Sequence, residues 1–187
     1  EYWVDQDFKI YKIKVPVQYS DAIREGFEEL LDFKVEGATI AQQKQTILVP
    51  MRDGIKLSTD IYFPENSEGK LPIVFIRTPY KKEMQELDGF YWAKNGYVCA
   101  IQDVRGRFAS EGEWEPFVNE AEDGYDAIEW LAAQDWSNGK IGMIGASYVG
   151  WVQLWAASQQ PPHLVTIIPN VAPPDPFYNI PYEYGSF

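Results

Sequence analysis

From residue 71 onward, short apolar segments alternate with segments of helical character, and this alternation constrains the fold most. The apolar segments expected to be strands are Leu71–Arg77, Tyr97–Val104, Gly139–Ile144 and Leu164–Pro169. The intervening segments expected to be helices are 87–95, 119–133 and 148–158. Short apolar strands separated by helices are typical of βαβ units, whose parallel strands form a sheet covered on both faces. The pattern therefore predicts the α/β fold class.

A hairpin is predicted ahead of these segments. Residues 46–50 and 55–63 have strand character, and the Arg52, Asp53 and Gly54 residues between them favour a tight turn. Because its two strands run antiparallel, we expect this hairpin at one edge of an otherwise mostly parallel sheet.

Three divisions of the chain are expected. Residues 1–45 form an amino-terminal extension, in which Asp21–Asp32 has the apolar spacing of a helix. Residues 46–172 form the amino-terminal part of the α/β domain. Residues 173–187, which are rich in proline and tyrosine, start a cap region.

Composition excludes several classes of protein. The chain has 16 Lys and Arg against 28 Asp and Glu, a net charge of −12, which excludes a general phosphate-backbone binder and predicts no nucleic-acid partner. No apolar run approaches the roughly 20 residues of a membrane helix, so no membrane partner is expected. The lone Cys99 allows neither an internal disulfide nor a cysteine-rich metal site. We expect no cofactor and no metal, and the sequence is compatible with either the cytoplasm or export.

A serine between a predicted strand and a predicted helix is the main candidate for chemistry. Small residues stand at positions 145, 146 and 150 around Ser147. Position 149, where the usual motif has a further small residue, holds Val149 instead. Such a sharp turn presents a serine hydroxyl at the carboxyl end of a parallel strand, as in a nucleophile elbow. The N–H of Tyr148, at the helix N-terminus, then faces the position where an oxyanion would form. The alternative is a serine that only caps the helix.

Several motifs together resemble one family. They are Ser147–Gly150, Arg77–Tyr80, Gln102–Arg107 and Ser110–Gly112. In combination they resemble the α/β-hydrolases that include cocaine esterase, X-prolyl dipeptidyl peptidases, α-amino-acid ester hydrolases and glutaryl acylases. The resemblance covers roughly residues 46–187. It implies an α/β-hydrolase fold, with a mostly parallel sheet and an antiparallel edge hairpin, that is incomplete in this chain.

The resemblance also implies roles for individual residues. Ser147 would form an acyl-enzyme, and the hydroxyl of Tyr80 would join the backbone N–H of Tyr148 as an oxyanion donor. Aromatic residues after the elbow are candidates for an apolar acyl pocket, or alternatively for ordinary core and cap packing. These substrate-binding candidates are Trp151, Phe177 and Tyr182.

Charged residues near the predicted site have a structural interpretation. Asp103 and Arg105 end a predicted strand, and we expect them to form a pair that braces the loops under the elbow rather than an active-site charge. A run of acidic residues follows between positions 111 and 126. It lacks the ligand spacing of a calcium loop, so we expect a solvated acidic face.

No candidate general base lies near Ser147. The single histidine, His163, follows the helix that starts at the elbow, so it should lie at the opposite edge of the sheet. A base must lie within about 3 Å of the serine oxygen. We therefore interpret the chain as an amino-terminal portion that is inactive alone. The resemblance implies that the remaining polypeptide would supply the triad Asp and His, a cap and a jelly-roll domain, and oligomers are possible.

The sequence favours a serine hydrolase that acts on a small ester, amide or short peptide. Alternatives within the family are an X-prolyl dipeptidyl peptidase and a β-lactam or amino-ester acylase. The acylase is disfavoured because the carboxylate that would hold a substrate ammonium is missing from 179–181. The alternative outside catalysis is an α/β domain for binding or assembly.

Overall fold

The computed structural model describes residues 2–4, 10–15, 20–23, 44–65 and 69–172, and the chain divides into two compact units, Glu1–Ala41 and Gln42–Phe187. The first unit contains an antiparallel sheet of β1 (Tyr2–Val4), β2 (Ile10–Val15) and β3 (Ser20–Ile23). The helix predicted over Asp21–Asp32 is wrong at its start. Residues 21–23 pair with β2 as strand β3, and this pairing outweighs the local helical spacing, while 24–32 lie outside the described residues.

The described residues of the second unit form a six-stranded sheet in the order β4-β5-β7-β6-β8-β9. The strands are β4 (Lys44–Pro50), β5 (Lys56–Tyr62), β6 (Leu71–Thr78), β7 (Val98–Asp103), β8 (Ser137–Ala146) and β9 (Leu164–Asn170). Strands β7, β6, β8 and β9 are parallel, whereas β4 and β5 form an antiparallel hairpin at one edge. The predicted mostly parallel sheet with an edge hairpin is confirmed.

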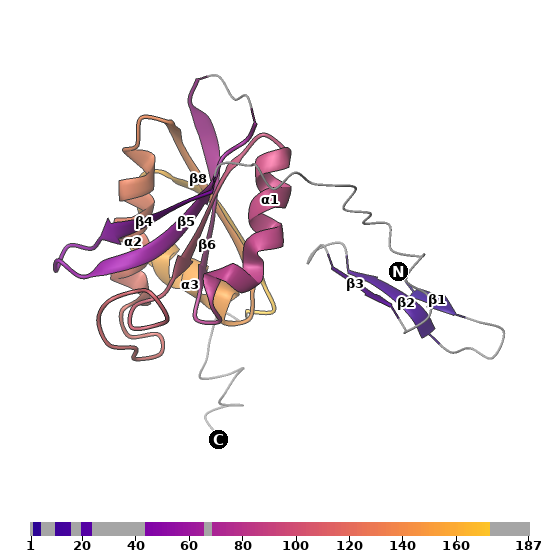
Figure 1. The fold of residues 1–187 in the computed structure, drawn as a ribbon. Coiled ribbons are helices and arrows are strands. Elements are labelled where there is room, and N and C mark those ends of the chain that lie inside the picture. Colours follow the sequence, from indigo (N-terminus) through magenta and orange to yellow (C-terminus); the bar gives the residue numbers. More distant parts are fainter. Residues whose placement is uncertain (1, 5–9, 16–19, 24–43, 66–68, 173–187) are drawn as a thin grey trace. The chain divides into compact units, whose positions relative to one another are not determined.

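Helices cover both faces of this sheet (Figure 1). They are α1 (Glu86–Lys94), preceded by the 3-10 helix η3 (Lys82–Gln85), α2 (Glu120–Ala132) and α3 (Tyr148–Ser158). α2 and α3 pack against each other and share one face, while α1 packs on the other face against β5 and β7. None of the described helices could span a membrane.

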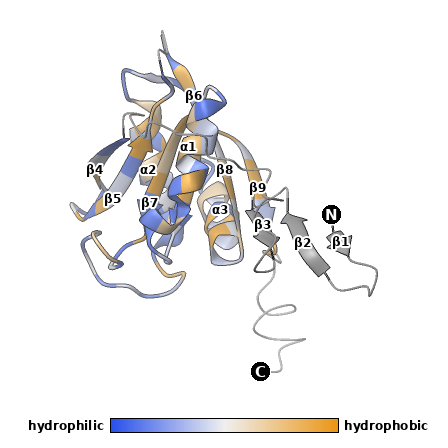
Figure 2. Cartoon of the chain, turned by 45° about the vertical axis from the view of Figure 1, so that its right-hand side comes forward, coloured by the Kyte–Doolittle hydropathy of each residue, from blue (hydrophilic) through white to orange (hydrophobic). Residues whose placement is uncertain are grey.

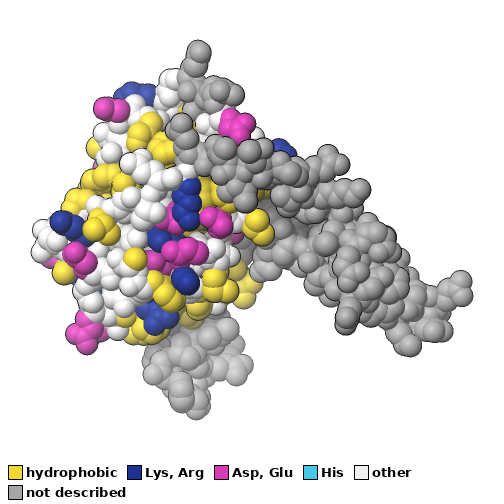
Figure 3. All heavy atoms as spheres, viewed as in Figure 1, with side chains coloured by type: hydrophobic (Ala, Val, Ile, Leu, Met, Phe, Trp, Pro, Cys, Tyr) yellow, Lys and Arg dark blue, Asp and Glu magenta, His cyan; other side chains and the backbone are white. Residues whose placement is uncertain are grey.

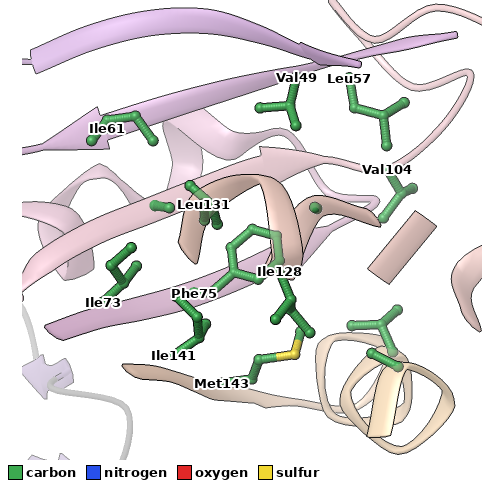
Figure 4. Packing of buried hydrophobic residues seen from close by; sticks show 14 of the residues in the cluster. Val49, Leu57, Ile61, Ile73, Phe75, Val104, Ile128, Leu131, Ile141 and Met143 are labelled. Carbon is green, nitrogen blue, oxygen red and sulfur yellow. The ribbon is translucent and has the colours of Figure 1, made fainter. Parts of the chain in front are cut away.

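The core follows the two-residue period of the strands. In β6, Ile73 and Phe75 point to the α2–α3 face, whereas Val74 and Ile76 point to the α1 face. Figure 4 shows Phe75 packed among residues of β8 and α2, including Met143 and Ile128. Figure 2 shows that hydrophobic residues dominate the central strands and that hydrophilic ones concentrate in the connecting loops. Burial on both faces explains why these strands read as continuous apolar segments.

The strand at the far edge of the sheet is less covered. In β9, Val165 is 60% exposed and Ile168 is 47% exposed, although β9 pairs with β8 along its length. Elsewhere the surface mixes charges of both signs with apolar side chains, as the face in Figure 3 shows.

The parallel register gathers the carboxyl ends of four strands at one edge of the sheet. Thr78 of β6 pairs with Asp103 of β7, and Ala146 of β8 pairs with Asn170 of β9. In α/β sheets, ligands bind outside this edge. The loops that follow Thr78, Asp103 and Ala146 therefore define where a functional site belongs.

Burial raises the pKa of Asp88, in α1, to about 6 from its ordinary value of 3.8. The folded state therefore holds this proton more tightly than the unfolded state, and the stability contributed by the protonated carboxyl is lost as the pH rises through 6. We expect Asp88→Asn to raise the free energy of unfolding at pH 7.5 by about 1 kcal/mol and to change it little near pH 4. Urea unfolding of both proteins across this range tests the expectation, and an equal difference at both pH values would contradict it.

Candidate functional site

Ser147 occupies a strained turn between β8 and α3. Its backbone has φ 59° and ψ −127°, a region that L-residues rarely adopt, and the residue is exposed. The turn is held from both sides, because its N–H donates to the carbonyl of Asn170 at 3.0 Å and its carbonyl accepts from Gly150 and Trp151. Residues in such conformations cluster at active sites, where the surrounding structure holds them in place.

Close contacts around the turn explain its small residues. A Cβ at Gly145, whose φ is 148°, would lie 2.2 Å from Cγ1 of Val149, and a Cβ at Gly150 would lie 2.8 Å from the carbonyl oxygen of Asn170. Val149 therefore occupies the space that Gly145 leaves open. The departure at position 149 is thus compatible with the sharp turn.

The backbone N–H and the phenol hydroxyl of Tyr148, the residue after Ser147, have different surroundings. As the first residue of α3, Tyr148 has a backbone N–H with no acceptor within the helix. Its phenol is buried, where the hydroxyl donates to Oε1 of Glu120 at 2.7 Å and accepts from the N–H of Phe117 at 3.1 Å. Burial raises the pKa of this phenol, and the Glu120 carboxylate raises it further. Only the backbone group of Tyr148 is thus available to a ligand.

Tyr80 lies in the loop after β6 and is brought to the same place. Its side chain is 52% exposed, and its ring meets that of Tyr148 edge to face, with centroids 6.5 Å apart. Its backbone N–H donates to the hydroxyl of Thr78 at 3.1 Å. The structure thus brings Ser147, Tyr148 and Tyr80 together from two strand ends.

A buried charge network lies beneath these residues. Arg77, at the end of β6, is fully buried, and its Nη1 contacts Oε2 of Glu120 at 2.8 Å. Its Nε donates to the side chain of Gln102 at 2.9 Å. Asp123, one turn along α2, is also buried and lies 3.9 Å from Arg77. The prediction of a solvated acidic face is therefore wrong for Glu120 and Asp123, because both face the sheet and offset the charge of buried or half-buried arginines.

The predicted pair of Asp103 with Arg105 is also wrong. Asp103 instead accepts the backbone N–H of Lys82 at 2.8 Å, and burial raises the pKa of its carboxyl. Arg105 forms a bidentate contact with Asp123, at 2.6 and 3.0 Å, and also binds Asp53 at 2.7 Å. Hydrogen bonding to Asp123 raises the pKa of Arg105. Both residues brace loops around the elbow, each with its own partner, because their strand-end positions face different neighbours.

An aromatic residue that the sequence analysis missed lies beside the elbow. Phe117 stacks on Tyr148, with centroids 4.4 Å apart, and meets Trp151 edge to face at 5.1 Å. Its φ of 68° is another strained backbone conformation. Trp151 is half-buried in the first turn of α3. The other two predicted pocket residues, Phe177 and Tyr182, lie outside the described residues.

His163 lies far from Ser147, as predicted. It precedes β9, where its carbonyl accepts the N–H of Ile141, while Ser147 binds Asn170 at the other end of that strand. The seven residues of β9 span about 20 Å. The imidazole Nδ1 instead contacts Glu129 at 2.7 Å. Within residues 44–65 and 69–172, no cluster of three His, Cys, Asp or Glu side chains could hold a metal.

The mostly parallel sheet, its covering helices and the strand–turn–helix at Ser147 define an α/β-hydrolase fold, present here in part. Residues 53–187 match the family model of X-Pro dipeptidyl-peptidase (S15 family), and the chain belongs to this family.

Several relatives of this chain are named as hydrolases of different kinds. Cocaine esterase of Rhodococcus sp. is 39% identical over 145 residues, which are 74% of this chain and 25% of that protein. The structure of a CocE/NonD family hydrolase from Staphylococcus aureus matches with a TM-score of 0.64 and 34% identity, over 75% of this chain and 29% of that one. An α-amino acid ester hydrolase matches with a TM-score of 0.62 and 31% identity, over 75% and 28%. The chain thus spans about a quarter of the length of these relatives.

The buried pair of Arg77 and Glu120 predicts that two neighbouring carboxylates of α2 contribute very differently to the free energy of unfolding. We expect Glu120→Ala to lower the free energy of unfolding by about 3 kcal/mol, because it leaves the buried guanidinium without its main partner. Glu122→Ala is the matched control, since Glu122 is 65% exposed, and we expect a loss below about 0.5 kcal/mol. Urea unfolding followed by tryptophan fluorescence measures both, and equal losses would contradict the assigned role.

Proposed function

We propose that Ser147 is the nucleophile of a serine hydrolase that cleaves carboxylic esters or amides through an acyl-enzyme. The observation that carries this proposal is the strained, exposed conformation of Ser147, with φ 59° and ψ −127°, at the carboxyl edge of the sheet. A serine that merely caps a helix needs no such conformation, because N-cap residues adopt ordinary β-region angles. Its side chain, moreover, makes no cap hydrogen bond to the described part of α3.

The chemistry assigns a role to each residue near the turn. Oγ of Ser147 attacks the substrate carbonyl carbon and loses its proton to a general base, and the carbonyl oxygen becomes negative. The N–H of Tyr148 and the hydroxyl of Tyr80 donate to this oxygen. Collapse of the intermediate breaks the bond to the alcohol or amine, which departs with the proton. Water then attacks the acyl-enzyme by the same steps and releases the carboxylic acid and Ser147.

The general base comes from outside these 187 residues in this proposal. The one imidazole in the sequence, that of His163, lies about 20 Å away along β9 and is bonded to Glu129. The chain therefore contributes the nucleophile and the oxyanion donors, and the rest of the polypeptide contributes the acid and base. We expect these 187 residues alone to show negligible turnover.

Esters are the proposed substrate class. The half-buried rings of Phe117 and Trp151 pack against each other, and Trp151 lies in the turn of α3 that follows Ser147, so apolar side chains there favour an apolar acyl group. The names of the relatives, cocaine esterase and an α-amino acid ester hydrolase, support the choice. The family description supports X-Pro dipeptides as the second candidate.

Labelling by a fluorophosphonate tests the nucleophile. In the complete enzyme we expect stoichiometric labelling on the peptide that contains Ser147, because only an activated serine attacks this phosphorus centre at a useful rate. Ser147→Ala should abolish labelling and hydrolysis, while Ser158→Ala, at the exposed end of α3, should preserve both. Labelling of another serine, or hydrolysis by the Ser147→Ala protein, would refute the proposal.

Paired substrates test the substrate class. We expect kcat/KM for an aromatic p-nitrophenyl ester to exceed that for an Xaa-Pro p-nitroanilide by at least about 100-fold, because the ester has the better leaving group and its acyl group can contact the apolar side chains of Phe117 and Trp151. Both substrates release p-nitro chromophores, so one spectrophotometric assay of the complete enzyme compares them. A higher value for the anilide would favour the dipeptidyl-peptidase alternative.

A further inference from the structure

The segment around Tyr80 is held in a strained conformation. Lys81, the next residue, has φ 81° and ψ 114°, which a residue with a side chain rarely adopts. Such strain costs about 1–3 kcal/mol and persists only where surrounding contacts enforce it. The contacts that hold the backbone around Tyr80 therefore indicate how the loop positions this residue.

Side chains from the end of β7 and from the loop after it provide two of these contacts. Nε of Arg107 donates to the carbonyl oxygen of Pro79 at 3.1 Å, and Oδ1 of Asp103 accepts the N–H of Lys82 at 2.8 Å. The two bonds bracket Tyr80, one on the residue before it and one two residues after it. Main-chain donation from Val104 to the carbonyl of Thr78, at 3.1 Å, continues the link between the two strand ends.

Arg107 is itself held rigidly. Its guanidinium carbon lies 4.5 Å from the centroid of Trp114 and 4.9 Å from that of Phe108, so two aromatic rings flank the cation. The backbone turns tightly at Gly106, whose N–H donates to Glu111 at 2.9 Å. A Cβ at Gly106 would lie 2.2 Å from the backbone nitrogen of Trp114, so the loop closes on itself there. The Arg107 side chain that donates to Pro79 thus extends from a closed loop and lies between two aromatic rings.

From this geometry we infer that Arg107 is a positioning residue, which fixes the Pro79–Tyr80 backbone so that the Tyr80 hydroxyl is preorganised to donate to the oxyanion. The inference rests on the proposed function. Tyr80 is 52% exposed and its ring meets Tyr148 edge to face, so the placement of its side chain depends strongly on its backbone. A donor contributes most to catalysis when no reorganisation is needed as charge develops.

Arg107 is the residue to test rather than Asp103. Asp103 is fully buried, and its substitution would disturb the core, whereas Arg107 is half-buried on a surface loop. Arg107→Lys keeps the charge and part of the contact with the two rings, but it lacks the rigid planar fork that directs an N–H at Pro79. The substitution therefore removes the positioning bond with little other change.

A double-mutant cycle on ester hydrolysis by the complete enzyme separates positioning from a structural role. We expect Tyr80→Phe to lower kcat about 100-fold and Arg107→Lys to lower it about 10-fold, each with KM within about two-fold, because oxyanion donors act mainly in the transition state. The double variant should be as slow as Tyr80→Phe alone, since Arg107 acts through the lost hydroxyl. Active-site titration with fluorophosphonate normalises kcat for the folded fraction, and Arg52→Lys, on another exposed loop, is the matched control.

The outcomes separate this inference from the proposed function. An unchanged kcat in Arg107→Lys, or the same ten-fold loss in the Tyr80→Phe background, would overturn the positioning role while Ser147 is still labelled. Full activity of Tyr80→Phe would remove the oxyanion role and the inference with it. Retained hydrolysis by Ser147→Ala would reject the proposed function itself.

Discussion

The ion pair between Arg77 and Glu120 joins the parts on which the candidate site depends. It links the end of β6 to the start of α2, and through the hydroxyl of Tyr148 it reaches the first residue of α3. Burying a guanidinium completely costs several kcal/mol unless its donors are satisfied. Gln102 accepts from Nε, and the backbone and side chain of Glu120 accept from Nη1, whereas Nη2 lies 3.9 Å from Asp123 without a hydrogen bond. The pair therefore couples the central sheet to α2 and, through Tyr148, to α3.

Strain is concentrated in the loops at the carboxyl edge of the sheet. Ser147, Lys81 and Phe117 all have positive φ, and all lie in the loops that meet around the elbow. Each is held by neighbouring bonds: Ser147 by Asn170, Lys81 by the bracket at Pro79 and Lys82, and Phe117 by the hydroxyl of Tyr148. The stable sheet beneath offsets the cost of these conformations, and the site can keep geometries that an isolated loop would not hold.

Local sequence spacing was sufficient to predict the sheet, the edge hairpin, the turn at Ser147 and the remote position of His163. These features depend on periodicity and chain order, which a single sequence displays. The partners of Asp103 and Arg105, the burial of Glu120 and the contacts of Phe117 and Arg107 depend on which loops meet, which spacing does not encode. One signal was nevertheless present: Arg77 ends a buried strand, and Glu120 and Asp123 recur at three-residue spacing beside the apolar Ala127 of α2.

The close approach of Val149 to Gly145 restricts which residues the turn can accept. Because a Cβ at 145 would occupy the space of the Val149 side chain, the two positions share a single volume across the turn. The positive φ at 145 disfavours any side chain there, and the Cβ of Val149, 2.8 Å from the added atom, would still be in the way after truncation to alanine. Glycine at 145 is therefore what allows a branched side chain at 149.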